Sequence, residues 1–153
     1  MQSTVIKYGF YGLLAGFIIF LLHLTLGTSL SYSTNQILGF ISIFIALSFV
    51  YFGIKHFRDN INKGGVSLGK AILIGVLISL LVGIGIGIAD FIYTKFIDPD
   101  FFNNYEQMLI DKGREDEIIE MTSASAGLFM VGLVTVIGFI ISLISGLILQ
   151  CKN

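Results

Sequence analysis

The chain has 153 residues, of which 55% are hydrophobic and only 12% are charged. A soluble domain carries about a quarter charged residues, so this composition indicates a protein that resides in lipid. The formal net charge of −1 excludes a basic nucleic-acid-binding protein and an acidic disordered chain. A single cysteine, Cys151, excludes a disulfide framework and a multi-cysteine metal site.

Four stretches are long and apolar enough to cross a bilayer, which takes about 20 residues of helix. We expect these helices at about residues 5–26, 36–57, 68–97 and 121–150. The first run is longer than the apolar core of a cleavable signal peptide, about 7–15 residues, so we expect it to be retained. The runs lack the alternation of a lipid-facing β-barrel, and a helix satisfies its own backbone in lipid. The sequence therefore predicts an all-α integral membrane protein, with residues 1–153 forming a single four-helix transmembrane bundle.

Basic residues in short loops set the orientation of such a bundle. On one side lie Lys7, Lys55, Arg58, Lys63, Lys70 and Lys152. On the other side lie only Lys95, Lys112 and Arg114. We therefore expect both termini and the loop of residues 55–70 to face the cytoplasm.

The acidic segment of residues 98–120 is then expected on the outer side, because it is too polar to span. Asp98 followed by Pro99 is typical of a helix N-terminus, and Gly113 of a helix end. The pattern predicts a short amphipathic helix that rests on the outer membrane surface or caps the bundle, and the alternative is a solvated acidic linker. We expect residues 114–121 to be helical and to lead into the fourth span. The apolar face consists of Phe101, Phe102, Tyr105, Met108 and Leu109.

Small residues recur every four positions in the third span and again in the fourth. Because lipid provides no hydrophobic drive between helices, close approach of small residues is a common means of packing. We expect the third helix to be central, with its small stripe against the fourth or the first helix, so that leucine at Gly83 or Gly87 lowers the folded yield. The alternative is that glycine is simply frequent in membrane helices. The stripes are Ala71, Gly75, Ser79, Gly83 and Gly87, then Gly138, Ser142 and Gly146, with Gly12 and Gly16 in the first helix.

Asp90 and His23 are the informative ionisable residues of the spans, because a charge in hydrocarbon is costly and usually faces a bundle interior or polar path. At about 1.5 Å per residue, both fall in the outer part of the bilayer. A hydrogen bond between them is geometrically possible and would form an intramembrane polar pair. The alternative is that each side chain reaches interfacial water alone.

Lys55, Arg58, Lys63 and Lys70 form a basic cytoplasmic edge. Such an edge sets topology and attracts anionic headgroups at about 1 kcal/mol per basic residue, and an acidic partner is the alternative. Residues 64–71 match a phosphate-binding loop except that Ala71 replaces its hydroxyl residue. A membrane helix on each side excludes that interpretation, so we expect a Gly64-Gly65 turn with Ser67 capping the third helix and no nucleotide.

No catalytic constellation is recognisable. His23 and His56 are expected on opposite sides of the membrane, so they cannot share a metal ion or a triad. No metal-ligand spacing appears elsewhere. We therefore expect no cofactor and no enzymatic activity.

Two stretches of the chain resemble a known family. They are residues 46–59, which end in Gly-Ile-Lys-His-Phe-Arg-Asp, and residues 64–71 with the Ser-Leu-Gly-Lys-Ala entry to the third helix. With Ile97–Phe101 and residues 142–149, they resemble the family catalogued as domain of unknown function 4199. The resemblance implies a small bacterial inner-membrane protein with four helices and no assigned activity.

Three classes of function remain. The first is a non-catalytic accessory, structural or envelope-sensing protein that acts through a membrane-protein partner. The second is a small transporter or channel subunit, working as a homo-oligomer with Asp90 and His23 lining a polar path. A membrane enzyme ranks last.

Overall fold

The computed structural model describes residues 1–150, and within them every regular element is helical. Four helices are long and apolar enough to cross a membrane. They are α1 (Gln2–Leu26), α2 (Tyr32–His56), α3 (Leu68–Ile92) and α5 (Ser123–Leu149). The predicted all-α membrane bundle is confirmed. Cys151 and Lys152 lie outside the described residues.

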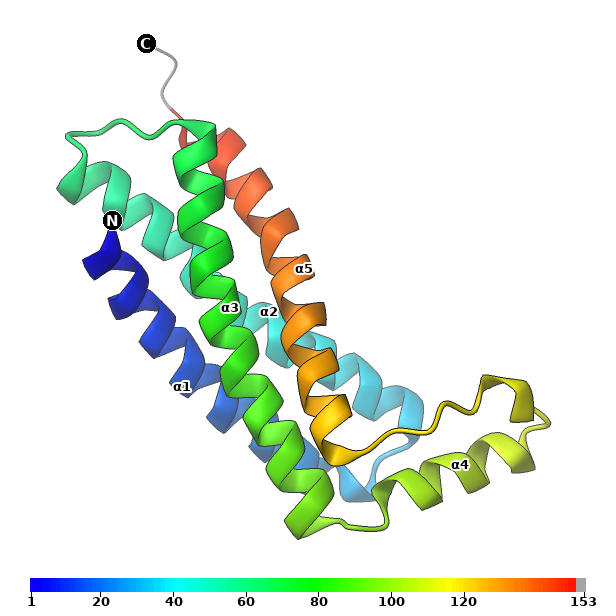
Figure 1. Ribbon diagram of the computed structural model, residues 1–153. Coiled ribbons are helices and arrows are strands. Elements are labelled where there is room, and N and C mark those ends of the chain that lie inside the picture. Colours follow the sequence, from blue (N-terminus) through cyan, green and yellow to red (C-terminus); the bar gives the residue numbers. More distant parts are fainter. Residues whose placement is uncertain (151–153) are drawn as a thin grey trace.

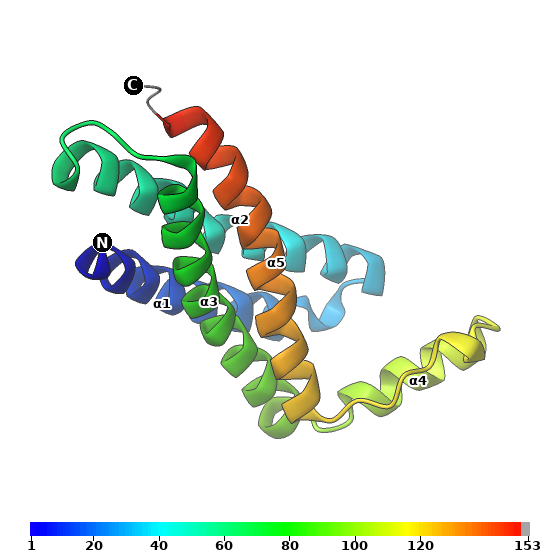
Figure 2. The same cartoon turned by 45° about the horizontal axis from the view of Figure 1, so that its top comes forward.

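The bundle has two distinct ends (Figure 1). The N-terminus, the end of α5 and the loop between α2 and α3 meet at one end, which we call the terminal end. The other end, which we call the α4 end, carries the α1–α2 turn and the short helix α4 (Phe101–Asp111). Figure 2 shows α4 projecting sideways from the bundle, with α3 and α5 side by side. The helix order thus places the basic loop and both termini together, away from the acidic segment.

Local capping explains where the long helices begin. α2 starts at Tyr32, four residues before the predicted position, because the Ser31 hydroxyl accepts a hydrogen bond from the Thr34 amide (3.3 Å). Ser67 caps α3 as predicted, with its hydroxyl accepting from the Lys70 amide. Thr122 opens α5 through a reciprocal capping box. Single π-helical turns prolong α2 (Phe57–Ile61) and α3 (Tyr93–Ile97).

The acidic segment differs from its prediction at two points. Asp98 does not cap α4: its carbonyl accepts from the Phe101 amide in a turn, and Asp100 takes the N-cap position without a side-chain bond. Residues 114–121 are not a helix, because only Glu115–Glu117 form a short 3₁₀ turn. Gly113, at φ +67°, follows α4, and Figure 2 shows that the end of this helix lies away from the bundle. The chain must then return to α5, and extended backbone covers about twice the distance per residue that a helix does.

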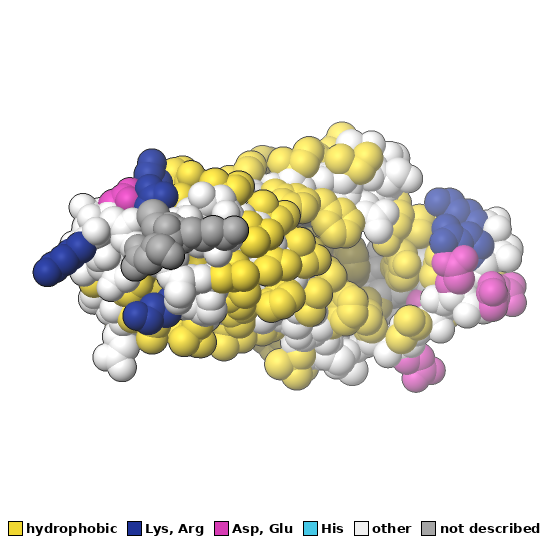
Figure 3. All heavy atoms as spheres, turned by 90° about the horizontal axis from the view of Figure 1, so that it is seen from above, with side chains coloured by type: hydrophobic (Ala, Val, Ile, Leu, Met, Phe, Trp, Pro, Cys, Tyr) yellow, Lys and Arg dark blue, Asp and Glu magenta, His cyan; other side chains and the backbone are white. Residues whose placement is uncertain are grey.

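Helix α3 lies at the centre and contacts α1, α2 and α5. Ile74, Ile78, Val82 and Ile86 of α3 are fully buried in the hydrophobic core. Ile78 lies against Gly53 of α2, whereas Val82 and Ile86 lie against Gly12 and Gly16 of α1. Figure 3 shows the outcome on the surface: charged side chains gather at the two ends, and the zone between them is almost entirely apolar. This band is the surface that faces lipid in a protein crossing a membrane.

Candidate functional site

Two adjoining cavities open at the α4 end, between α2, α5 and α4. The first, which we call the acidic cavity, has a volume of about 310 Å³ and reaches Asp90, Glu106 and Glu117. The second, which we call the inner cavity, has about 300 Å³ and reaches His23 and Asn35. They share four lining residues and are therefore neighbours, and we refer to the two together as the α4-end cleft. The shared residues are Tyr32, Phe101, Phe129 and Met130.

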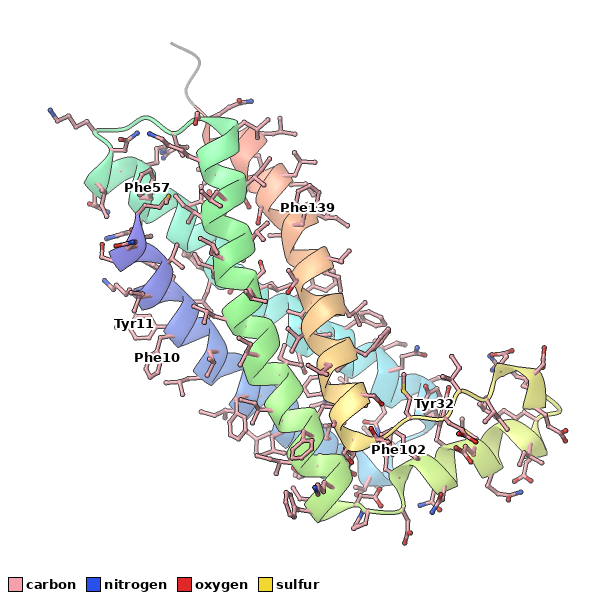
Figure 4. The ribbon with its side chains drawn as sticks, viewed as in Figure 1. Phe10, Tyr11, Tyr32, Phe57, Phe102 and Phe139 are labelled. Atoms are coloured by element: carbon pink, nitrogen blue, oxygen red, sulfur yellow. The ribbon has the colours of Figure 1, made fainter. Side chains whose placement is uncertain are left out.

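Aromatic contacts position α4 over this cleft. The Tyr32 ring, at the start of α2, lies 5.2 Å from that of Tyr105 on α4. Phe101 packs edge-on against Tyr93 at 6.0 Å. Figure 4 shows Tyr32 and Phe102 together at this end, whereas Phe10 and Phe139 point outward from the bundle. The predicted apolar face of α4 is its covered face, so α4 is the predicted amphipathic helix and not a solvated linker. It projects from the bundle and meets it through the aromatic contacts of Tyr105 and Phe101.

Asp90 supplies a carboxylate without a counter-charge. It lies on the last turns of α3, half-buried, and borders the acidic cavity. Within residues 1–150 its carboxylate makes no hydrogen bond or ion pair. The nearest basic residue along the chain, Lys95, instead lies over the Phe91 ring at 5.2 Å. The acidic cavity therefore presents an unpaired carboxylate among aromatic walls, and no Lys or Arg of the described chain lines it.

His23 forms its hydrogen bond with Asn35 and not with Asp90. Its Nε2 donates to the Asn35 carbonyl oxygen (3.0 Å), and Asn35 Nδ2 donates to the Gly27 carbonyl oxygen (2.8 Å). The turn after α1 brings Asn35 to His23, so the histidine ties α1 to α2. The structure thus places His23 and Asp90 on adjoining cavities without a bond between them. His23 Nδ1 remains buried with no hydrogen-bond partner in the described chain.

Of the other carboxylates in the acidic cavity, Glu117 is neutralised locally. Its two oxygens accept from the Arg114 guanidinium in a bidentate pair, at 2.7 Å for the Nε contact. This hydrogen bonding lowers the pKa of Glu117 and raises that of Arg114. Glu106 has no such pair in the described residues. The cavity consequently keeps two uncompensated carboxylates, those of Asp90 and Glu106.

The small-residue stripes lie outside this cleft, in the contact between α3 and α5. Gly75 faces Ser142 and Gly138 faces Ser79. Towards the α4 end, a Cβ on Gly87 would lie 2.6 Å from the Gly127 carbonyl oxygen, and one on Gly83 would lie 3.0 Å from that of Val131. Gly146 lies against Ala71. On the opposite face of α3, Gly12 meets Val82 and Gly16 meets Ile86.

The serines of these stripes donate their hydroxyl hydrogens within their own helices and are closed off from any ligand by burial. Ser79 donates to the Gly75 carbonyl oxygen (2.7 Å) and Ser142 to that of Gly138 (2.6 Å), and both are fully buried. Each hydroxyl is thus satisfied within its own helix. The α3–α5 contact is therefore a packing surface.

The basic edge lies at the terminal end, far along the bundle from the cleft. Lys55, Lys63 and Lys70 are exposed there, and Arg58 forms an ion pair with Asp59 (2.6 Å). Gly64 adopts φ +88° in the turn that precedes α3. The edge surrounds no cavity among those described.

Sequence reasoning missed Tyr32, Asn35, Phe129 and Met130 as parts of a site. For the first two a signal existed, because Ser31 followed by Thr34 is an N-cap pattern that would have started α2 early. Phe129 and Met130 are apolar residues of a membrane helix, and nothing in their pattern distinguishes a cavity wall from a lipid-facing surface.

The chain belongs to a family described as "Protein of unknown function (DUF4199)", whose model matches residues 7–150. No curated protein and no solved structure matches the chain. The family match confirms the resemblance that the sequence indicated. Because the family has no assigned function, the function of this chain has to be argued from the cleft.

Proposed function

We propose that this member of the family is a non-catalytic accessory protein of the bacterial inner membrane, which senses the envelope or stabilises a partner by binding at its α4 end. We place that end on the outer side and both termini in the cytoplasm. The basic residues support this orientation, because Lys7, Lys55, Lys63 and Lys70 all lie towards the terminal end.

The observation that carries the proposal is that the α4-end cleft is blind. Ile43 on α2 and Leu133 on α5 are the lining residues deepest in the bundle. Directly beyond them Ala46, Leu47 and Val50 are fully buried, as is Val134. A recess that stops at a packed layer is suited to holding a bound group rather than to conducting one.

A transporter or channel subunit is the second candidate, and one observation favours it. His23 and Asp90 line adjoining cavities, as the residues of a polar path would. The packed layer blocks such a path within one chain, so conduction would require an assembly of several copies.

Three single-cysteine variants test the proposal, each in a Cys151→Ser background. Ile119→Cys lies at the rim of the cleft, where Ile119 is 70% exposed. Thr28→Cys is exposed at the same end and lines neither cavity, and Lys63→Cys is exposed at the other end. Spheroplasts are treated with a membrane-impermeant, thiol-reactive photo-crosslinker and then irradiated, and the adducts are identified by mass spectrometry.

We expect Ile119→Cys and Thr28→Cys to be labelled and Lys63→Cys to be protected. A stoichiometric partner should cross-link from Ile119→Cys and much less from Thr28→Cys. Labelling of Lys63→Cys alone would show that the chain has the opposite orientation in the membrane. Adducts only between copies of this chain would favour the transporter, and equal adducts from both labelled positions would contradict binding at the cleft.

A further inference from the structure

The walls of the acidic cavity suit one chemical class of ligand. Its polar groups are carboxylates, and its apolar surface consists largely of aromatic rings, namely Tyr32, Phe101, Phe102, Tyr105 and Phe129. Aromatic faces attract cations through the ring quadrupole, most strongly when water is excluded. An anion would meet Asp90 and Glu106, and Arg114, the basic residue near Tyr32 and Tyr105, already pairs with Glu117.

The volume of the cleft fixes the size of that ligand. Cavities that hold small molecules measure about 300–1,000 Å³ and combine apolar walls with a few polar groups. The acidic cavity is at the lower end of that range, and the inner cavity extends it along α2 and α5 with apolar walls formed by Phe20, Phe40, Ile43 and Leu133. A charged head in the first cavity and an apolar body in the second would fill the cleft.

We propose that the α4-end cleft binds a small organic cation with an apolar body, with its ammonium group beside Asp90 and against the aromatic pair of Tyr32 and Tyr105. The inference rests on the proposed function in that the same cleft serves both. It extends that function by naming the chemistry of the group that is sensed. Glu117 takes no direct part, since Arg114 already pairs with it.

An amine of this kind has two sources, a soluble amphiphile and the ammonium headgroup of a lipid. Both would place a cation beside a half-buried carboxylate of a membrane helix, which removes the cost of leaving that charge unpaired. The experiment below therefore uses a soluble probe in two lipid backgrounds.

The probe is benzyltrimethylammonium, and its counterpart is phenylmethanesulfonate, which has the same aromatic body and the opposite charge. Binding is measured by isothermal titration calorimetry on the full chain in nanodiscs. We expect saturable binding of the cation and none of the anion. Asp90→Asn should weaken the cation affinity at least about tenfold, because it removes the charge but preserves the shape. Tyr105→Leu should weaken it about three- to tenfold through the lost ring face.

Glu115→Gln is the matched control, since Glu115 is an exposed carboxylate of the same segment that lines neither cavity. Its affinity should equal that of the unmodified chain. Circular dichroism and gel filtration establish that Asp90→Asn is folded. Equal affinity in Asp90→Asn, equal loss in Glu115→Gln, or binding of the anion would overturn the proposal.

The lipid arms separate the two sources. In phosphatidylglycerol discs no ammonium headgroup competes, whereas discs containing phosphatidylethanolamine supply one. A difference between the unmodified chain and Asp90→Asn that holds in both discs assigns the cleft to a soluble amine. A difference that disappears with phosphatidylethanolamine assigns it to the lipid headgroup. Cation binding that persists without a partner cross-link at Ile119→Cys would overturn the accessory role alone, and a partner cross-link without cation binding would overturn only the ligand.

Discussion

The α3–α5 contact and the α4-end cleft share helix α5 but are built in opposite ways. Between α3 and α5, glycines face serines and the two backbones approach closely (Figures 1 and 2). At the α4 end, the larger side chains of Phe129, Met130 and Tyr32 line a space between α2 and α5. Small residues therefore close the α3–α5 contact, whereas larger ones leave space between α2 and α5.

The largest loss of stability should come from a larger side chain in the α3–α5 contact. Gly138→Leu would drive a side chain into Ser79, and the backbones would have to separate. We expect a loss of at least about 3 kcal/mol of stability and a strongly reduced folded yield, measured by denaturation in mixed micelles and by gel filtration. Gly87→Leu should behave in the same way.

Gly132→Leu is the control on the same helix, because a Cβ at Gly132 meets nothing within 4 Å. Its stability should stay within about 0.5 kcal/mol of the unmodified chain. Equal losses at Gly132 and Gly138 would mean that glycine content, rather than the α3–α5 contact, determines folding.

A second, intermediate effect compares a filled position with a cavity wall. Ile78 is fully buried in the packed layer, so Ile78→Ala should cost about 2 kcal/mol through lost packing contacts. Met130 borders both cavities, and Met130→Ala should cost less than about 1 kcal/mol because fewer atoms surround it. The same denaturation assay measures both. The reverse order would show that the cleft is closed in the membrane.

The smallest effect concerns the rim of the cleft and is a pH dependence. Since Arg114 lowers the pKa of Glu117, the pair contributes at pH values above the ordinary glutamate pKa and is lost as the pH falls through the lowered value. Arg114→Gln should therefore raise the pKa of Glu117 towards its ordinary value. A carbon-13 NMR titration of the Glu117 carboxyl measures this, and an unchanged pKa in Arg114→Gln would refute the pairing.

The α3–α5 contact could be predicted from the sequence, whereas the cleft could not. Small residues repeat in the α3 span from Ala71 to Gly87 at a helical period, so their common face can be read directly from the sequence. The covered face of α4 follows from the same kind of pattern. Asp90 and His23 stood out because ionisable residues are rare in a span.

The cleft itself depends on how far α2 separates from α5, and that separation is a property of the packed bundle. Tyr32 and Phe129 are far apart in the sequence, and no local pattern places them on one wall. The partner of His23 was likewise hidden, because Asn35 lies on the first turn of α2, before the residue at which this helix was predicted to begin. Long-range geometry accounts for the first omission, and the position of a helix start accounts for the second.

The pairing of serines over glycines also has a mechanical consequence. Gly75 opposite Ser142 and Ser79 opposite Gly138 interlock at intervals of four residues, so shifting α5 along α3 by a residue or two would bring Ser142 against larger side chains such as Ile74. The two helices can change register only by about a whole turn, or 5.4 Å. They form a rigid spine, and any change in the shape of the cleft has to arise from rocking of α2 or lifting of α4 against it.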